Sequence, residues 1–206
     1  AMLAGDPVSL CVEAGNAEWL MASGLSFLDG KDGIRITDRA ITAEDPTLVF
    51  HPPVLALGIG CERGVDATEI IDLVEKTLAD AGLAPSAVAC VVSVDVKADE
   101  AALHAVAAHL AVPARFFSPA RLEAETPRLA NPSDIVFAEV GCHGVAEGSA
   151  LAAVGQDGVL VVAKQKSKRA TCAIGRSIAP LDPTEIGAKR GCLSVVGIGP
   201  GSPAWR

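Results

Sequence analysis

Apolar and polar positions follow one another in blocks along the middle of the chain, and the blocks have the lengths of strands and helices. Residues 54–60 (VLALGIG) form an apolar run that is typical of a buried strand. A helix is predicted to begin at Asp66, with Glu69 completing a capping-box-like pair, and to end at Gly82. Its apolar side chains recur at helical spacing: Ile70, Ile71, Val74 and Leu78.

The same order of blocks then repeats. Residues 87–94 (AVACVVSV) are apolar nearly throughout, as expected for a strand that is covered on both faces. A helix over residues 99–110 and a short strand at 114–117 follow. Because strand, helix and strand alternate, the pattern predicts parallel βαβ units.

The rhythm changes in the last third of the chain. After a polar, proline-containing stretch we expect a strand at 135–139 and a short helix at 145–153. The runs 158–165 and 169–174 are strand-like and are joined by a polar turn, which predicts an antiparallel hairpin. The predicted fold is therefore an α/β fold, a three-layer α/β/α domain with a mixed, mainly parallel sheet.

The first fifty residues have little helical period. Short β-like pieces at 8–12, 34–36 and 48–50 are separated by turn residues, and His51-Pro52-Pro53 enforces an extended backbone after them. We therefore expect a small β-rich segment at 1–53, a main domain at 54–178, a linker at 179–192, and at 193–206 the start of a different domain.

Composition narrows the functional classes. With 206 residues and 50% apolar content, the chain can bury one core of domain size, and its apolar stretches are interrupted before the roughly 18 residues of a membrane span. A net charge of −8 argues against nucleic acid. The six cysteines have no zinc-site spacing and no secretory signal precedes them, so we expect no metal and a cytoplasmic protein.

Four short groups of residues carry a more specific signal. They are 58–64 (GIGCERG), 93–97 (SVDVK) with Asp99 and Glu100, 145–147 (VAE) with Ser149 and Ala150, and Lys164 with 170–173 (ATCA). In this order and spacing they resemble the C-terminal domain of the CbiG/CobE family of cobalamin (vitamin B12) biosynthesis proteins, over residues 54–175. Residues 1–53 look like the central region of the longer CbiG form, whose N-terminal domain this chain lacks.

The tail gives a second resemblance. Residues 193–201 (LSVVGIGPG) and 202–206 (SPAWR) look like the opening strand and loop of the tetrapyrrole methyltransferases, most of all precorrin-3B C17-methyltransferase. This implies a fusion protein of which only the start of the methyltransferase is present. We expect S-adenosylmethionine only in that missing domain and no cofactor in this chain. The tail is expected to be inactive, and to be extended, poorly packed or paired as a stray strand.

The first resemblance implies an activity on a corrin precursor. It is the hydrolysis of the ring A lactone of cobalt-precorrin-5A with release of acetaldehyde, and this fragment alone is expected to be inactive or weakly active. The alternative is a non-catalytic binding or delivery module of the CobE type that serves other corrin-pathway enzymes. A nucleotide-binding α/β domain is a third interpretation, which the G-x-G-x-x-x-G spacing does not favour.

The loop after the first strand is a candidate anion site, because it leads into a helix N-terminus and contains a guanidinium group. We expect it to bind substrate through Gly58, Gly60, Cys61, Arg63 and Gly64. A tight turn without a ligand is the alternative.

Charged residues beyond the other strands complete the predicted site. Asp95 or Glu147 would act as general base, and Lys97 would donate to the oxyanion or hold a carboxylate. Their alternatives are a surface ion network around Asp95 and a plain helix residue at 147. We also expect substrate contacts from Lys164, Lys166 and Thr171.

Two further features have competing interpretations. The basic run at 164–169 either grips the carboxylates of a corrin precursor or is a solvated turn. Glu139 is a further carboxylate near the turn that contains Cys142 and His143. That cysteine and histidine supply too few ligands for a closed metal site, so we expect a core cysteine beside a solvent-facing histidine.

Overall fold

The computed structural model describes residues 8–24, 26–27, 33–41 and 48–191. The expectations about the tail at 193–206 therefore lie outside the described residues. In chain order the strands and α-helices are β1 (Ser9–Val12), α1 (Glu18–Met21), β2 (Gly33–Ile36), β3 (Leu48–Phe50), β4 (Leu55–Cys61), α2 (Ala67–Asp80), β5 (Val88–Val94), α3 (Ala101–His109), β6 (Ala114–Phe117), α4 (Pro119–Glu123), α5 (Asp134–Val140), α6 (Val145–Val154), β7 (Val159–Lys166) and β8 (Ala170–Arg176).

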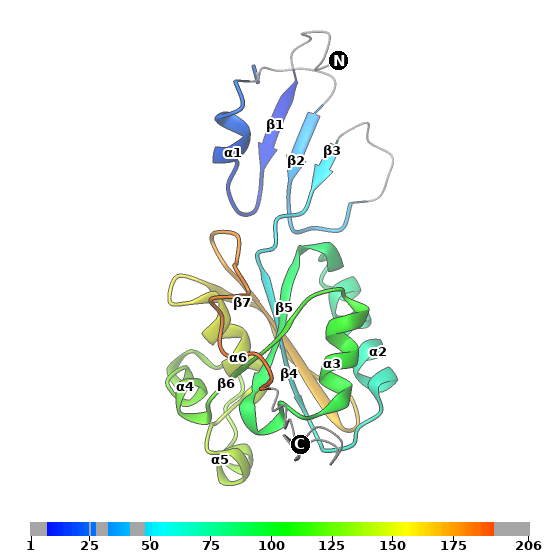
Figure 1. Cartoon of the computed structure of the whole chain (residues 1–206), viewed down its shortest axis with the longest axis vertical. Coiled ribbons are helices and arrows are strands. Elements are labelled where there is room, and N and C mark those ends of the chain that lie inside the picture. Colours follow the sequence, from blue (N-terminus) through cyan, green and yellow to red (C-terminus); the bar gives the residue numbers. More distant parts are fainter. Residues whose placement is uncertain (1–7, 25, 28–32, 42–47, 192–206) are drawn as a thin grey trace, which may run out of the picture.

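A five-stranded sheet in the order β6-β5-β4-β8-β7 forms the centre of the molecule. Strand β4 pairs in parallel with β5, which pairs in parallel with β6, whereas β8 is antiparallel to both β4 and β7. Helices α2 and α3 lie on one side of this sheet and α4 and α6 on the other (Figure 1). The α/β fold with a mixed sheet is therefore confirmed, as is the antiparallel hairpin.

The face of the sheet under α6 is built from small residues. A Cβ atom at Gly58 would lie 1.9 Å from the Ala146 carbonyl oxygen, and one at Gly175 would lie 2.8 Å from that of Ala150. Nearly every residue of α6 is buried, as expected for a helix that is apolar on all sides. Gly58 thus serves close helix–sheet packing, which is the reason this strand contains glycine at that point.

Helix α2 begins and ends where the sequence indicates. The Asp66 carboxylate accepts the Thr68 N–H at 3.0 Å, and Gly82 follows the helix with a φ of +62°. Glu69, however, is engaged elsewhere: its carboxylate accepts the Ser167 hydroxyl at 2.6 Å and the Arg169 N–H at 2.7 Å. The predicted capping-box role of Glu69 gives way to a tie between α2 and the β7–β8 turn.

The strand predicted at 135–139 is wrong, because these residues belong to helix α5. The Ser133 hydroxyl accepts the Val136 N–H at the start of the helix, and Gly141, with a φ of +82°, ends it. No residue of α5 is fully buried. A short apolar run with capping residues on both sides has formed a surface helix.

Residues 8–50 contribute a second, smaller sheet. Strands β1, β2 and β3 pair in parallel, and Leu20 of α1 packs with Ile34 and Ile36 of β2. The Asp38 carboxylate accepts a hydrogen bond from Arg176 at the end of β8, which joins the two sheets. Among the described residues, no helix has the length and apolar character needed to cross a membrane.

Candidate functional site

A cleft of about 780 Å³ opens at the carboxyl ends of β4 and β5. Helix α5, the first residues of α6 and the β7–β8 hairpin form its other walls. It lies at the end of the five-stranded sheet that points away from the three-stranded sheet (Figure 1). Open α/β sheets commonly bind their ligands outside the carboxyl ends of the strands, so this cleft is the candidate site.

The loops that follow β4 and β5, which contain the predicted site residues Arg63 and Lys97, meet at the same edge of the sheet. The Arg63 guanidinium donates to the Val96 carbonyl oxygen at 2.6 Å and to the Asp99 carboxylate at 2.9 Å. Because β4 and β5 are parallel, the loops that follow them meet at one end. The parallel arrangement that the βαβ pattern predicts is therefore confirmed.

Most of the predicted site residues line the cleft. They are Gly60, Cys61, Arg63, Lys97, Glu147, Lys164, Lys166 and Thr171. Three others lie outside its lining in the described structure: Gly58 packs under α6, Gly64 donates its N–H to Glu100 at 3.1 Å, and Asp95 is an exposed residue of a turn.

The predicted anion site in the 58–64 loop is already filled by carboxylates of the chain itself. Glu100 accepts the Gly64 N–H, Asp66 accepts at the start of α2, and Asp99 pairs with Arg63. The hydrogen bond from Arg63 holds the pKa of Asp99 below its usual range. The loop is therefore a braced turn, in which the N–H groups of Glu62 and Gly64 and the guanidinium of Arg63 have intramolecular partners.

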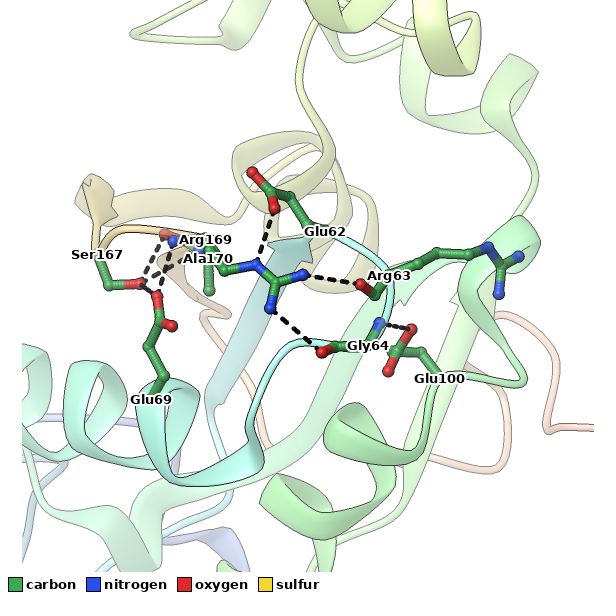
Figure 2. A network of polar contacts seen from close by, with 8 residues as sticks. All are labelled: Glu62, Arg63, Gly64, Glu69, Glu100, Ser167, Arg169 and Ala170. Atoms are coloured by element: carbon green, nitrogen blue, oxygen red, sulfur yellow. Dashed lines mark hydrogen bonds and ion pairs between the residues drawn. The ribbon is translucent and has the colours of Figure 1, made fainter.

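Arg169 is the centre of a network that fastens the hairpin to this loop (Figure 2). Its guanidinium donates to the Glu62 carboxylate at 2.8 Å and to the carbonyl oxygens of Arg63 and Gly64. Figure 2 also shows the Glu69 carboxylate meeting Ser167 in the turn of the hairpin. Arg169 thus shapes the cleft and is committed to the protein itself.

Glu147 is buried and acts as a brace, that is, its carboxylate joins neighbouring segments of the chain by hydrogen bonds. Its carboxylate accepts the Asn131 N–H at 2.9 Å, the Asn131 side-chain amide at 2.8 Å and the Lys164 N–H at 2.8 Å. Burial alone would raise its pKa, but these hydrogen bonds outweigh burial and hold the pKa of Glu147 below its usual range. A carboxylate held in this way is a weak proton acceptor, so the structure does not favour the predicted role as general base.

The cleft has an excess of positive charge. Six basic and three acidic residues line it: Arg63, Lys97, Lys164, Lys166, Lys168 and Arg169, against Glu62, Glu139 and Glu147. Both arginines are ion-paired, whereas none of these four lysines has a salt bridge within the described residues. The Lys164 ammonium donates to the Asn131 carbonyl oxygen at 3.1 Å. The lysines are the groups left to meet an anionic ligand.

Two predicted contact residues have limited chemistry. Burial, the largest effect, raises the pKa of Cys61 to about 11, so its thiol is protonated and unreactive at neutral pH. The Thr171 hydroxyl donates to the Gly60 carbonyl oxygen at 3.2 Å. Both residues shape the wall of the cleft.

The cleft also contains groups that the sequence interpretation missed or placed differently. His143 is half-buried, its Nδ1 is 2.9 Å from the Glu123 carboxylate, and its ring stacks on Phe137. Cys142 is a core cysteine, as expected. Among the described residues, no group of three or more His, Cys, Asp or Glu side chains is placed to hold a metal ion. Since Glu123 lies 20 residues before His143, spacing gave no signal for this pair.

Comparison with known proteins adds independent evidence. The family described as Cobalamin synthesis G C-terminus matches residues 55–175. The chain is 56% identical over 120 residues to Protein CobE of a Sinorhizobium species, which covers 58% of this chain and 78% of that protein. It is also 32% identical over 152 residues to Cobalt-precorrin-5A hydrolase of Priestia megaterium, covering 71% of this chain and 39% of the hydrolase.

A solved structure agrees with this assignment. The crystal structure of CobE, a protein from the cobalamin (vitamin B12) biosynthetic pathway, superposes with a TM-score of 0.57 at 38% identity. The superposition covers 60% of this chain and 89% of that one. The family match spans the five-stranded sheet with the cleft at its end. This chain belongs to the Cobalamin synthesis G C-terminus family and acts in cobalamin biosynthesis.

Proposed function

We propose that the cleft binds a corrin precursor by its acetate and propionate side chains. The observation that carries this proposal is the set of four lysines without ion pairs in a chain of net charge −8. A local cluster of ammonium groups attracts a polycarboxylate and offers each carboxylate a charge-assisted hydrogen bond.

The size and composition of the cleft support a ligand of this kind. Its volume of about 780 Å³ lies within the usual range of about 300–1,000 Å³ for small-molecule sites. Apolar side chains line the cleft beside the charged ones: Val94, Val96, Val136, Val140 and Val145. A corrin ring with apolar faces and a carboxylate periphery matches a site that combines both types of group.

Hydrolysis of cobalt-precorrin-5A is a second candidate function. It is supported by the match to a protein named Cobalt-precorrin-5A hydrolase, which extends over 152 residues. The resemblance implies opening of the ring A lactone and release of acetaldehyde. The chain spans 39% of that relative. Binding and delivery of the precursor is the function that the cleft supports best, because its lysines are the groups left to meet an anionic ligand.

The wider organisation is also a proposal. We infer a small β-rich segment at 1–53, the family domain at 54–178, a linker at 179–192 and the start of a methyltransferase at 193–206, which would bind S-adenosylmethionine only when complete. Other corrin-pathway enzymes would receive the bound intermediate. Five free cysteines among the described residues support a reducing compartment, the cytoplasm.

Titration with cobalt-precorrin-5A, followed by visible absorption, tests the binding function. We expect a saturable shift of the corrin spectrum at one equivalent, and no competition from ATP. A spectrum that stays unchanged at all protein concentrations, or binding of ATP in place of the corrin, would contradict the proposal.

A further inference from the structure

We propose that His143 is the acid–base group for attack of water on an ester-type carbonyl in this cleft, with Glu123 as its positioning residue. The inference rests on the proposed function, because it assumes that the cleft binds a corrin precursor. It adds a chemical step and the residue that carries the proton.

The orientation of the His143 ring is the first support. Its backbone N–H donates to one Glu123 oxygen at 3.0 Å, and its Nδ1 lies 2.9 Å from the other. The ring stacks on Phe137 with the centroids 4.5 Å apart and the planes at 24°. The carboxylate and the aromatic ring together hold one orientation of the ring, and in the tautomer that donates from Nδ1 to Glu123, Nε2 is the accepting nitrogen.

The second support is the position of Nε2. His143 belongs to the lining of the cleft, and its Nε2 lies 3.5 Å from Asp134 Oδ1. The side chain of Asp134 is fully exposed, so it can move aside at little cost. A water molecule that donates to Nε2 would therefore stand at the mouth of the cleft, within reach of a bound ligand.

Two other groups of the cleft, Glu147 and Cys61, are less suited to accept a proton. Glu147 has its carboxylate occupied by backbone and amide donors, and its pKa lies below the usual range. The Cys61 thiol, with a pKa of about 11, is protonated. Among the described lining residues, His143 combines a fixed ring with an accepting nitrogen.

The step balances without a further reactant. Water gives one proton to Nε2 of His143 while its oxygen bonds to the carbonyl carbon. The bond between that carbon and the ring oxygen then breaks, and the leaving oxygen takes the proton back from Nε2. A lactone thus becomes a carboxylic acid and an alcohol, with nothing oxidised or reduced. The ammonium groups of Lys97 and Lys164, which line the same cleft, are available to stabilise the oxyanion.

The test uses the full chain and cobalt-precorrin-5A, with binding followed by absorption and opening of the lactone by mass spectrometry. We expect the wild type to hydrolyse the lactone and His143→Asn to bind it with similar affinity while kcat falls by about 10²- to 10⁴-fold. The matched control is His109→Asn, since His109 forms the same type of pair with Glu75 outside the cleft. It should leave kcat unchanged.

Variants of Glu123 test the positioning role. Glu123→Gln retains an oxygen that can accept from Nδ1, so kcat should fall in the order wild type, Glu123→Gln, Glu123→Ala, with KM nearly constant. Glu75→Gln is the control. A role in folding alone would instead lower the amount of competent protein and leave kcat per bound corrin unchanged in both variants.

The possible outcomes distinguish a failure of the inference about His143 from a failure of the proposed binding function. If the wild type binds the corrin and never hydrolyses it, or if His143→Asn hydrolyses at the wild-type rate, the inference about His143 is overturned and the binding function stands. If the wild type does not bind the corrin at all, the proposed function itself fails.

Discussion

Individual residues of the cleft differ in how far their roles follow from the sequence. Arg63 and Lys97 come directly after apolar strands, so their place at the edge of the sheet could be predicted from the pattern. Glu147 could not be assigned in this way. Its role depends on donors 16 and 17 residues away, at Asn131 and Lys164, and no periodicity signals such contacts. The sequence position of Glu147 suggested a general base, whereas its hydrogen bonds show that it holds Asn131 and Lys164 in place.

The brace formed by Glu147 should be visible as a pH-dependent stability. Glu147→Gln replaces one accepting oxygen by an N–H₂ group that opposes the existing donors, so we expect a loss of about 1–3 kcal/mol of unfolding free energy at pH 7. The pKa of Glu147 is lower in the folded protein than in the unfolded chain. Its contribution to the unfolding free energy is therefore present above about pH 4.5, the pKa of the unfolded chain, and is lost as the pH falls through the pKa of the folded protein.

Urea unfolding of both proteins between pH 7 and pH 3 measures this difference. The gap in unfolding free energy between wild type and Glu147→Gln should narrow below pH 4.5. A gap that is absent at pH 7, or that grows on acidification, would argue against the brace. Glu139→Gln is a control, since Glu139 is exposed.

At the scale of elements, the βαβ units and the hairpin were predictable and α5 was not. Strand β5 is buried at every position, as its continuous apolar run indicates. The run in α5 contains β-branched and aromatic residues that favour a strand, but Ser133 and Gly141 cap it as a helix. The flanking capping residues indicated a helix, but the prediction followed the strand propensity of the residues within the short run.

Glu69 connects two elements, and its removal should loosen one of them. The Glu69 carboxylate of α2 accepts from Ser167 and Arg169 in the β7–β8 turn. In Glu69→Ala we expect faster hydrogen exchange at the Arg169 amide and weaker corrin binding, because the hairpin carries Lys164 and Lys166. Glu75→Ala, on the same helix but outside the cleft, is the control. An unchanged rate of hydrogen exchange at the Arg169 amide would show that the turn keeps its structure without Glu69.

At the scale of the whole molecule, charge is distributed unevenly. The chain has a net charge of −8, yet basic residues outnumber acidic ones two to one in the cleft. The sequence showed the basic run, and its two interpretations could be separated only by the fold. The fold brings the hairpin and the ends of β4 and β5 to a single cleft, where Lys97 and Lys164 belong to the same lining.

Corrin affinity as a function of salt tests this account most directly. We would measure the dissociation constant for cobalt-precorrin-5A in the wild type, in Lys164→Ala/Lys166→Ala, and in Lys76→Ala/Lys189→Ala, which removes the same charge outside the cleft. The cleft variant should lose about 1–3 kcal/mol of binding free energy at low salt, since charge-assisted hydrogen bonds are lost. This loss should shrink near 0.1 M ionic strength, where exposed charges are screened beyond about 10 Å. The control should bind like the wild type, and equal affinity of all three proteins at low salt would contradict a corrin site in this cleft.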